Sequence, residues 1–147
     1  MNNDSTISTL NDLIETSKDG EKGFAKAAEE TKDSQLRSLF SEGSTRCASS
    51  VRELQDLVRS LGGDPEKSGS ALAAMHRGWL DVKSAVTGRD DKAILNECER
   101  GEDVAKARYA KALREDLPAN VRAVVERQNA GVLANHDRVR ALRDAAK

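Results

Sequence analysis

Apolar and small residues recur at steps of three and four along most of the chain, a pattern typical of helices that bury one face. The first run predicts a helix over about residues 6–31. Its inner positions are Ile7, Leu10, Ile14, Ser17, Glu21, Phe24 and Ala28. A second helix begins at Asp33 or Ser34. Its inner positions are Leu36, Phe40, Gly43 or Ser44, Cys47, Val51, Leu54, Val58 and Leu61. Gly62, Gly63 and Pro65 end it, because glycine is favoured just past a helix end and proline soon after.

The remaining sequence predicts three more helices. A polar loop over residues 64–69 precedes a shorter helix over about residues 70–86. Asp90 and Asp91 then open a long helix by placing negative charge at its positive end. Its inner positions are Ile94 or Leu95, Cys98, Glu102, Ala105, Tyr109 and Ala112 or Leu113. Pro118 suits the first turn of the last helix. The inner positions there are Val121, Val125, Gln128, Val132, Asn135 or His136, Val139 and Leu142.

Four long helices and one short helix predict an all-α fold, an antiparallel four-helix bundle in a single domain over residues 1–147. Tight turns join the first pair and the last pair of long helices, which makes each pair antiparallel. The connection over residues 63–89 carries the short helix 70–86 and is long enough to return along the bundle, as in ferritin-like folds. Residues 1–5 are predicted to be flexible. A five-helix up-and-down bundle is the architectural alternative.

Several polar residues interrupt the apolar faces near the middle of the helices. Glu21 and Glu102 lie on the inner faces of their helices, and Gln128 lies on that of the last helix. If the first turn centres near residue 32, Glu21 faces Ser44. If the second turn centres near residue 117, Glu102 faces a position close to Gln128. The pattern therefore predicts one polar layer across the bundle, with Ser44, Tyr109 and Gln128 as members.

The layer has two interpretations. Di-iron bundles use one Glu from each of two helices and a Glu-x-x-His pair from each of the other two. Glu21 and Glu102 match the single carboxylates, and Tyr109 follows Glu102 at a suitable spacing, but both Glu-x-x-His pairs are missing. Their places hold Ser44 with Cys47 and Gln128 with Gly131.

A smaller iron or manganese site would use Glu21 and Glu102, with Glu99 or Cys47 as further ligands. The interpretation we favour is a hydrogen-bonded layer that fixes helix register. In this interpretation Arg46 and Arg108 flank the layer and pair with its carboxylates.

The charge pattern narrows the possible partners. The 147 residues include 24 basic and 25 acidic side chains, mixed along the chain, for a net charge of −1. There is no basic stripe of the kind that binds nucleic acid, and no electrostatic membrane anchor. The polar start and the lack of a long apolar run predict a cytoplasmic protein. In the cytoplasm Cys47 and Cys98 are expected to be reduced, and their place on the inner faces of the helices predicts that both are buried. No sequence motif predicts an enzyme.

Seven short stretches, spread over nearly the whole chain, carry a resemblance to a known family; they are residues 21–24, 27–31, 61–63, 76–79, 87–91, 98–103 and 136–137. In these stretches the sequence resembles an uncharacterised bacterial family of unknown function placed in the ferritin-like superfamily. The resemblance implies a ferritin-like bundle. It does not imply di-iron chemistry, because this chain departs from the ligand pattern at both Glu-x-x-His pairs.

We therefore expect a helical-bundle protein without catalysis, related to stress or storage by analogy. Apolar side chains on the flanks of the helices predict a homo-oligomer; they are Leu13, Leu39, Leu57 and Leu133. One alternative is a metal-binding redox or metal-storage protein that uses the polar layer. Another is a protein-interaction module with a patch around His76 and Trp79.

Overall fold

The fold is all-helical in the part of the chain that the computed structural model describes, residues 3–65 and 91–145. The helices are α1 (Asn3–Glu30), α2 (Ser34–Ser60), α4 (Asp91–Leu113) and α5 (Ala119–Ala145). No strand occurs within these two ranges, so the all-α prediction is confirmed there. The predicted short helix 70–86 and most of the predicted crossover lie outside the described residues.

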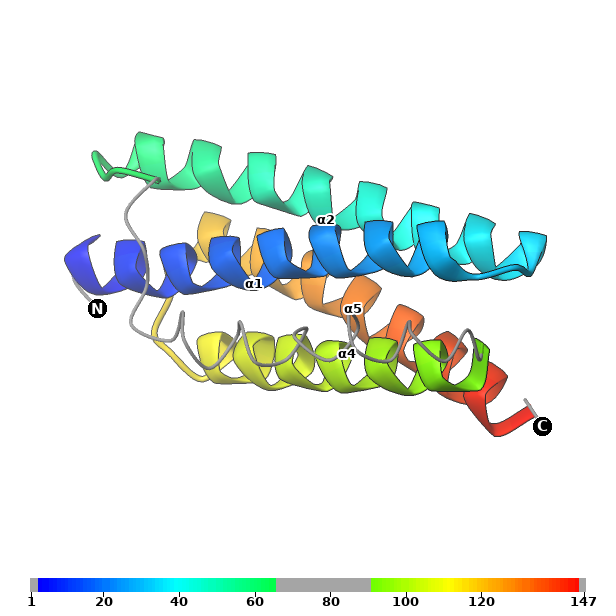
Figure 1. Ribbon diagram of the computed structural model, residues 1–147. Coiled ribbons are helices and arrows are strands. Elements are labelled where there is room, and N and C mark those ends of the chain that lie inside the picture. Colours follow the sequence, from blue (N-terminus) through cyan, green and yellow to red (C-terminus); the bar gives the residue numbers. More distant parts are fainter. Residues whose placement is uncertain (1–2, 66–90, 146–147) are drawn as a thin grey trace.

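The four helices lie side by side, as Figure 1 shows. The chain runs along α1 and returns along α2, and α4 runs in the same direction as α2 before α5 takes the chain back. α1 packs against both α2 and α4, whereas α5 packs closely against α4 and less closely against α2. At one end of the bundle the Thr31 hydroxyl, just past α1, donates a 2.7 Å hydrogen bond to the Asp91 carboxylate at the start of α4.

Helix ends follow from local capping. The Asp33 carboxylate accepts hydrogen bonds from the Gln35 and Leu36 amides at the start of α2, which satisfies donors that lack a partner inside the helix. At the other end of α2, Gly62 has φ 83°, a left-handed conformation that favours glycine.

The start of α1 differs from prediction. Residues 3–5, which we expected to be flexible, are helical, and Asp4 places a negative charge in the first turn where it stabilises the helix.

Two apolar clusters form the core, and the polar layer lies between them. One cluster gathers side chains from the first half of α1, the second half of α2 and the facing ends of α4 and α5, among them Leu10, Ile14, Leu54 and Val121. The other gathers the opposite ends and includes the stacked Phe24 and Phe40 rings, whose centroids lie 6.3 Å apart. This division sets the polar side chains in the middle of the bundle.

Glycines let α1 and α2 approach closely. A Cβ atom on Gly20 would lie 2.8 Å from the Cys47 sulfur, and one on Gly43 would lie 3.1 Å from the Phe24 ring. Both distances are shorter than normal carbon contacts, so a larger residue at either position would push the helices apart. The α1–α2 interface is therefore built from glycine on one helix against a larger side chain on the other.

The flanking leucines are less exposed than the sequence predicts. Leu13 and Leu39 are 1% and 6% exposed and belong to the core, so the prediction that they lie on spare outer flanks is wrong. Both pack inward because the buried face of each helix is wider than a single stripe. Leu133 is 37% exposed. Among the described residues, no helix is both long and apolar enough to cross a membrane.

Candidate functional site

Tyr109 is the centre of one level of the polar layer. Its hydroxyl donates a 2.8 Å hydrogen bond to Gln128 Oε1 on α5 and lies 3.3 Å from the Ser17 hydroxyl on α1. The ring is 1% exposed, and burial raises the pKa of Tyr109 to about 12. Tyr109 is therefore a neutral phenol that joins three helices through hydrogen bonds.

The same level extends to the surface between α2 and α5. Gln128 Nε2 donates a 2.8 Å hydrogen bond to Glu53 Oε1, and a longer one of 3.5 Å to the Ser50 carbonyl. The Arg127 guanidinium pairs with the other Glu53 oxygen. Hydrogen bonds from Arg127 and Gln128 lower the pKa of Glu53. A continuous chain of hydrogen bonds thus runs from Ser17 in the core to Arg127 at the surface.

Glu102 defines a second level, two helical turns from Tyr109. The carboxyl group is buried, accepts a hydrogen bond from the Asn135 amide and lies 3.8 Å from Arg46 Nη2. Burial raises the pKa of Glu102 to about 7, although Arg46, Asn135 and His136 act in the opposite direction. This carboxyl group therefore changes its charge near neutral pH.

A small internal cavity lies beside these groups. Its volume is about 20 Å³, which is room for about one water molecule. Side chains from α1, α2 and α4 line it together with Val132 of α5; the polar ones include Ser17, Arg46, Cys47, Glu102 and Tyr109. The cavity is too small for an organic substrate, which commonly needs a pocket of roughly 300 Å³ or more.

Both cysteines are buried free thiols. Burial raises the pKa of Cys47 to about 11, with the carboxylates of Glu102 and Glu21 acting in the same direction against Arg46. Burial also raises the pKa of Cys98 well above its usual value. A thiol must lose its proton to act as a nucleophile. Both cysteines therefore remain protonated thiols at neutral pH and are poor nucleophiles.

The four residues proposed from sequence as metal ligands do not come together. Glu102 and Cys47 line the same cavity, but Glu99 forms an ion pair with Arg143 of α5. Glu21 is half-buried and is not among the residues that line this cavity. Gly20, one position earlier, takes the inner place against Cys47, because the close α1–α2 contact requires a residue without a side chain.

Of the polar residues predicted for the layer, some contact each other in the bundle and others have different partners. Tyr109 and Gln128 bond to each other directly. Ser44 is half-buried and donates a 2.9 Å hydrogen bond to the Glu21 carbonyl, at the level where the two residues were expected to face each other. Glu102 lies opposite Asn135, about one turn beyond the predicted position, because the α4–α5 turn centres slightly later than residue 117.

Some members of the site were missed from the sequence. Glu53 and Arg127 lie outside the apolar stripes, and only the pairing of α2 with α5 brings them to Gln128. Arg46 approaches Glu102 as predicted, but Arg108 forms no ion pair with a carboxylate in the described part of the chain. His136, expected to be packed or at the surface, is buried and lies with Nε2 2.6 Å from Asp103 Oδ1.

These contacts do not fit a di-iron or other multi-ligand metal centre. Within residues 3–65 and 91–145, no three His, Cys, Asp or Glu side chains are grouped so that they could hold a metal ion. The Arg46 cation and the Asn135 amide stand next to Glu102, where metal coordination would require further anionic or imidazole donors. Hydrogen bonding is the chemistry that the arrangement supports.

Comparison with known proteins identifies the family to which this chain belongs. No curated protein matches the chain at significant similarity. A family model described as "Domain of unknown function (DUF2383)" matches residues 5–115. The match covers α1, α2 and α4 and ends before α5, so Gln128 and Asn135 lie outside it. Because the match spans most of the 147 residues, the chain belongs to the DUF2383 family.

Proposed function

We propose that the protein is a non-catalytic helical bundle of ferritin-like, antiparallel connectivity, in which the polar layer is a structural device and not a reaction centre. The layer sets the register of the four helices, and the protein acts through its outer surface in the cytoplasm. By analogy with ferritin-like bundles, that action belongs to stress protection or storage.

The observation that carries this proposal is the way in which Glu102 is partnered. A buried carboxyl group is costly unless it is neutralised or hydrogen-bonded. Here Asn135 donates to one oxygen and Arg46 lies close to the other. These partners come from two further helices, so the carboxyl group can be satisfied only when α2, α4 and α5 are in register.

The rest of the layer supports the same role. Tyr109 and Gln128 bond to each other and to groups on α1 and α2. A catalytic site needs a reactive group with room for a substrate beside it. The raised pKa values of both thiols and the cavity volume of about 20 Å³ do not meet that requirement.

The test combines metal analysis with stability measurements. The full chain would be purified from cells supplied with iron or manganese, and metal content would be measured for the wild type, Glu102→Ala and the exposed control Glu126→Ala. We expect well under one metal ion per chain in all three proteins. We also expect Glu102→Ala to lower the free energy of unfolding by about 1–3 kcal/mol at pH 4.5, where the buried carboxyl group is protonated, because Asn135 and Arg46 lose their partner.

The opposite result is easily recognised. Stoichiometric iron or manganese in the wild type that disappears in Glu102→Ala and persists in Glu126→Ala would overturn the proposal in favour of a metal protein. Full stability of Glu102→Ala at pH 4.5 in the absence of metal would also overturn it, because a layer that sets helix register must contribute to stability.

A further inference from the structure

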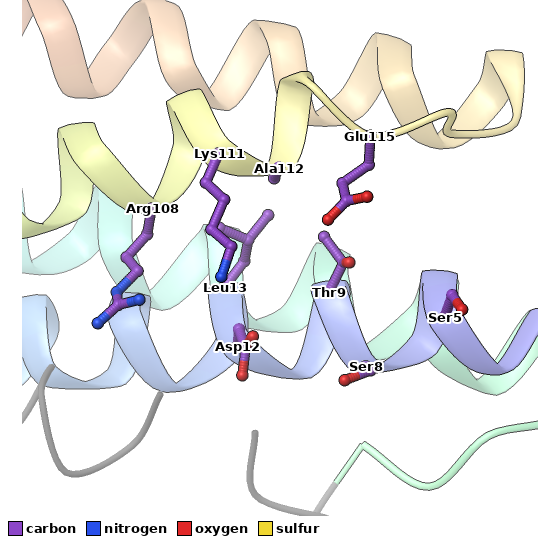
Figure 2. Close-up of a pocket in the computed structure, with 9 residues that line it drawn as sticks. All are labelled: Ser5, Ser8, Thr9, Asp12, Leu13, Arg108, Lys111, Ala112 and Glu115. Atoms are coloured by element: carbon purple, nitrogen blue, oxygen red, sulfur yellow. The ribbon is translucent and has the colours of Figure 1, made fainter. Parts of the chain in front are cut away.

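A groove separate from the polar layer lies between the start of α1 and the end of α4. Figure 2 shows the residues that line it. Its volume is about 290 Å³, at the lower end of the range for pockets that bind small molecules. Leu13 and Ala112 are 1% and 3% exposed and form an apolar floor. The rim is polar and includes the hydroxyls of Ser8 and Thr9.

Four charged side chains surround this groove, and they do not pair with one another. Arg108 and Lys111 come from α4 on the basic side, and Asp12 of α1 and Glu115, just after α4, provide the acids. Some basic side chains of the described chain, among them Arg46, Arg127 and Arg143, have acidic partners within 4 Å. No such ion pair involves any of these four groups in the described residues, and Asp12 Oδ1 is buried without a hydrogen bond there.

Glu115 and the two basic side chains occupy different parts of the groove, whereas Asp12 lies on the basic side (Figure 2). In Figure 2 the Lys111 side chain extends toward Leu13 and Asp12, and the Glu115 carboxylate points toward Thr9. The Arg108 side chain extends toward α1 at the opposite end of the groove from Glu115 (Figure 2). Glu115 lies two residues beyond the end of α4 at Leu113, four residues after Lys111 and seven after Arg108. In the same view Leu13 and Ala112 lie between Arg108 and Glu115.

From this arrangement we propose that the groove binds a small aliphatic zwitterion. Its anionic group, a carboxylate or a phosphate, pairs with Arg108 and Lys111, and its ammonium group pairs with Glu115. The methylene chain between the two lies on Leu13 and Ala112. A simple anion would leave the acids without a partner, and a simple cation would leave the bases without one, so a ligand with both charges fits best.

The experiment uses the full chain and matched probes. 5-Aminopentanoate carries both charges, pentanoate carries only the anion, and pentylamine carries only the cation. 4-Aminobutyl phosphate replaces the carboxylate by a phosphate and so identifies the preferred anion. Binding would be measured by titration calorimetry, and its location by amide chemical shifts of Ser8, Thr9 and residues 108–115.

We expect saturable binding of at least one of the two zwitterions, with affinity about tenfold or more above that of pentanoate and pentylamine. Arg108→Gln and Glu115→Gln should each weaken it by about tenfold, since each removes a charge-assisted hydrogen bond. The control variants Lys106→Gln on α4 and Glu126→Gln on α5 change exposed charges outside the groove, and should bind like the wild type. Thermal unfolding would verify that all four variants are folded.

Three results would overturn the proposal. One is the absence of saturable binding by either zwitterion, and another is equal weakening by the control variants. The third is binding of pentanoate as tight as that of 5-aminopentanoate and insensitive to Glu115→Gln, which would show a simple anion site. The polar layer is untouched by all these variants, so the outcome is independent of the function proposed above.

Discussion

The Tyr109 hydroxyl on α4 donates a 2.8 Å hydrogen bond to the Gln128 side-chain carbonyl on α5. Both side chains are buried, and the same hydroxyl lies 3.3 Å from Ser17 on α1. One phenol group therefore links three helices through hydrogen bonds, which fix helix register more specifically than apolar packing does. This linkage is the most direct evidence that the polar layer has a structural role.

Replacing Tyr109 by phenylalanine should test that role. Tyr109→Phe keeps the ring and removes the hydroxyl, which leaves Gln128 Oε1 without its donor inside the bundle. We expect the free energy of unfolding to fall by about 1–3 kcal/mol, the usual cost of a buried polar group without a partner. Urea denaturation followed by circular dichroism measures this change.

A double-mutant cycle separates the hydrogen bond from other effects of the substitution. In a Gln128→Leu background the acceptor is already gone, so Tyr109→Phe should cost clearly less than in the wild type. An equal cost in both backgrounds would mean that the Tyr109–Gln128 bond does not contribute to stability.

Glu102 should make stability depend on pH in an unusual direction. Its pKa is about 7 in the folded chain and 4.5 as an isolated group. Between these values the unfolded state loses its proton while the folded state keeps it, so a rise in pH favours unfolding. The contribution of Glu102 is therefore fully present below pH 4.5 and is lost by about pH 7. Its order of magnitude is about 3 kcal/mol, at about 1.4 kcal/mol per pKa unit.

The variant Glu102→Gln removes this titration. We expect it to match the wild type in stability near pH 4.5 and to be the more stable protein at pH 8, measured by urea denaturation at both pH values. The exposed Glu126→Gln provides the control and should keep the wild-type pH profile. An unchanged profile in Glu102→Gln would mean that the carboxyl group does not stay protonated on folding.

Gly20→Ala should destabilise the bundle through contact with Cys47. The added methyl would lie 2.8 Å from the Cys47 sulfur, and overpacking of this kind costs about 1–3 kcal/mol. Cys47→Ala removes the obstacle, so Gly20→Ala should be neutral or stabilising in that background, since alanine favours helix over glycine by about 1 kcal/mol. Thermal unfolding of the four proteins measures the effect.

A matched control for this prediction lies on α5. A methyl group on Gly131 would meet Arg46 Cδ only at 3.4 Å, an ordinary contact distance. Gly131→Ala should therefore leave the melting temperature unchanged or raise it. A similar loss of stability in Gly131→Ala and Gly20→Ala would show that contact with Cys47 is not the cause.

The two thiols should react slowly in the folded protein. Because burial raises the pKa of Cys47 to about 11 and that of Cys98 well above its usual value, little thiolate is present at pH 8, and access is also restricted. Alkylation by iodoacetamide, followed by mass spectrometry, should be slow without denaturant and fast in 6 M guanidinium chloride. Rapid modification of Cys47 in the folded chain would contradict the raised pKa.

The helices could be predicted well from the sequence, because their ends carry local signals. Asp33 caps α2, Gly62 ends it in a left-handed conformation, and Pro118 stands immediately before α5. Each of these depends on residues within a few positions in the chain. The start of α1 at Asn3 lies three residues before the predicted start at residue 6.

The polar layer could be predicted only in part. Tyr109 and Gln128 interrupt apolar stripes, so the sequence marks them. The contact of Gly20 with Cys47 was missed because glycine carries no apolar side chain, so a pattern of hydrophobic positions does not recognise it as part of the interface. Glu53 and Arg127 meet only because α2 lies next to α5, a relationship between distant segments that local patterns do not contain.

The glycine contacts between α1 and α2 have a consequence for how the molecule opens. Gly20 and Gly43 let two helices that follow each other in the chain pack at short range, whereas α5 lies less closely against α2. Segments with close local packing form cooperative units that open last. In amide hydrogen exchange we expect α1 and α2 to protect each other as one unit and to retain their amide protons after those of α5 have exchanged.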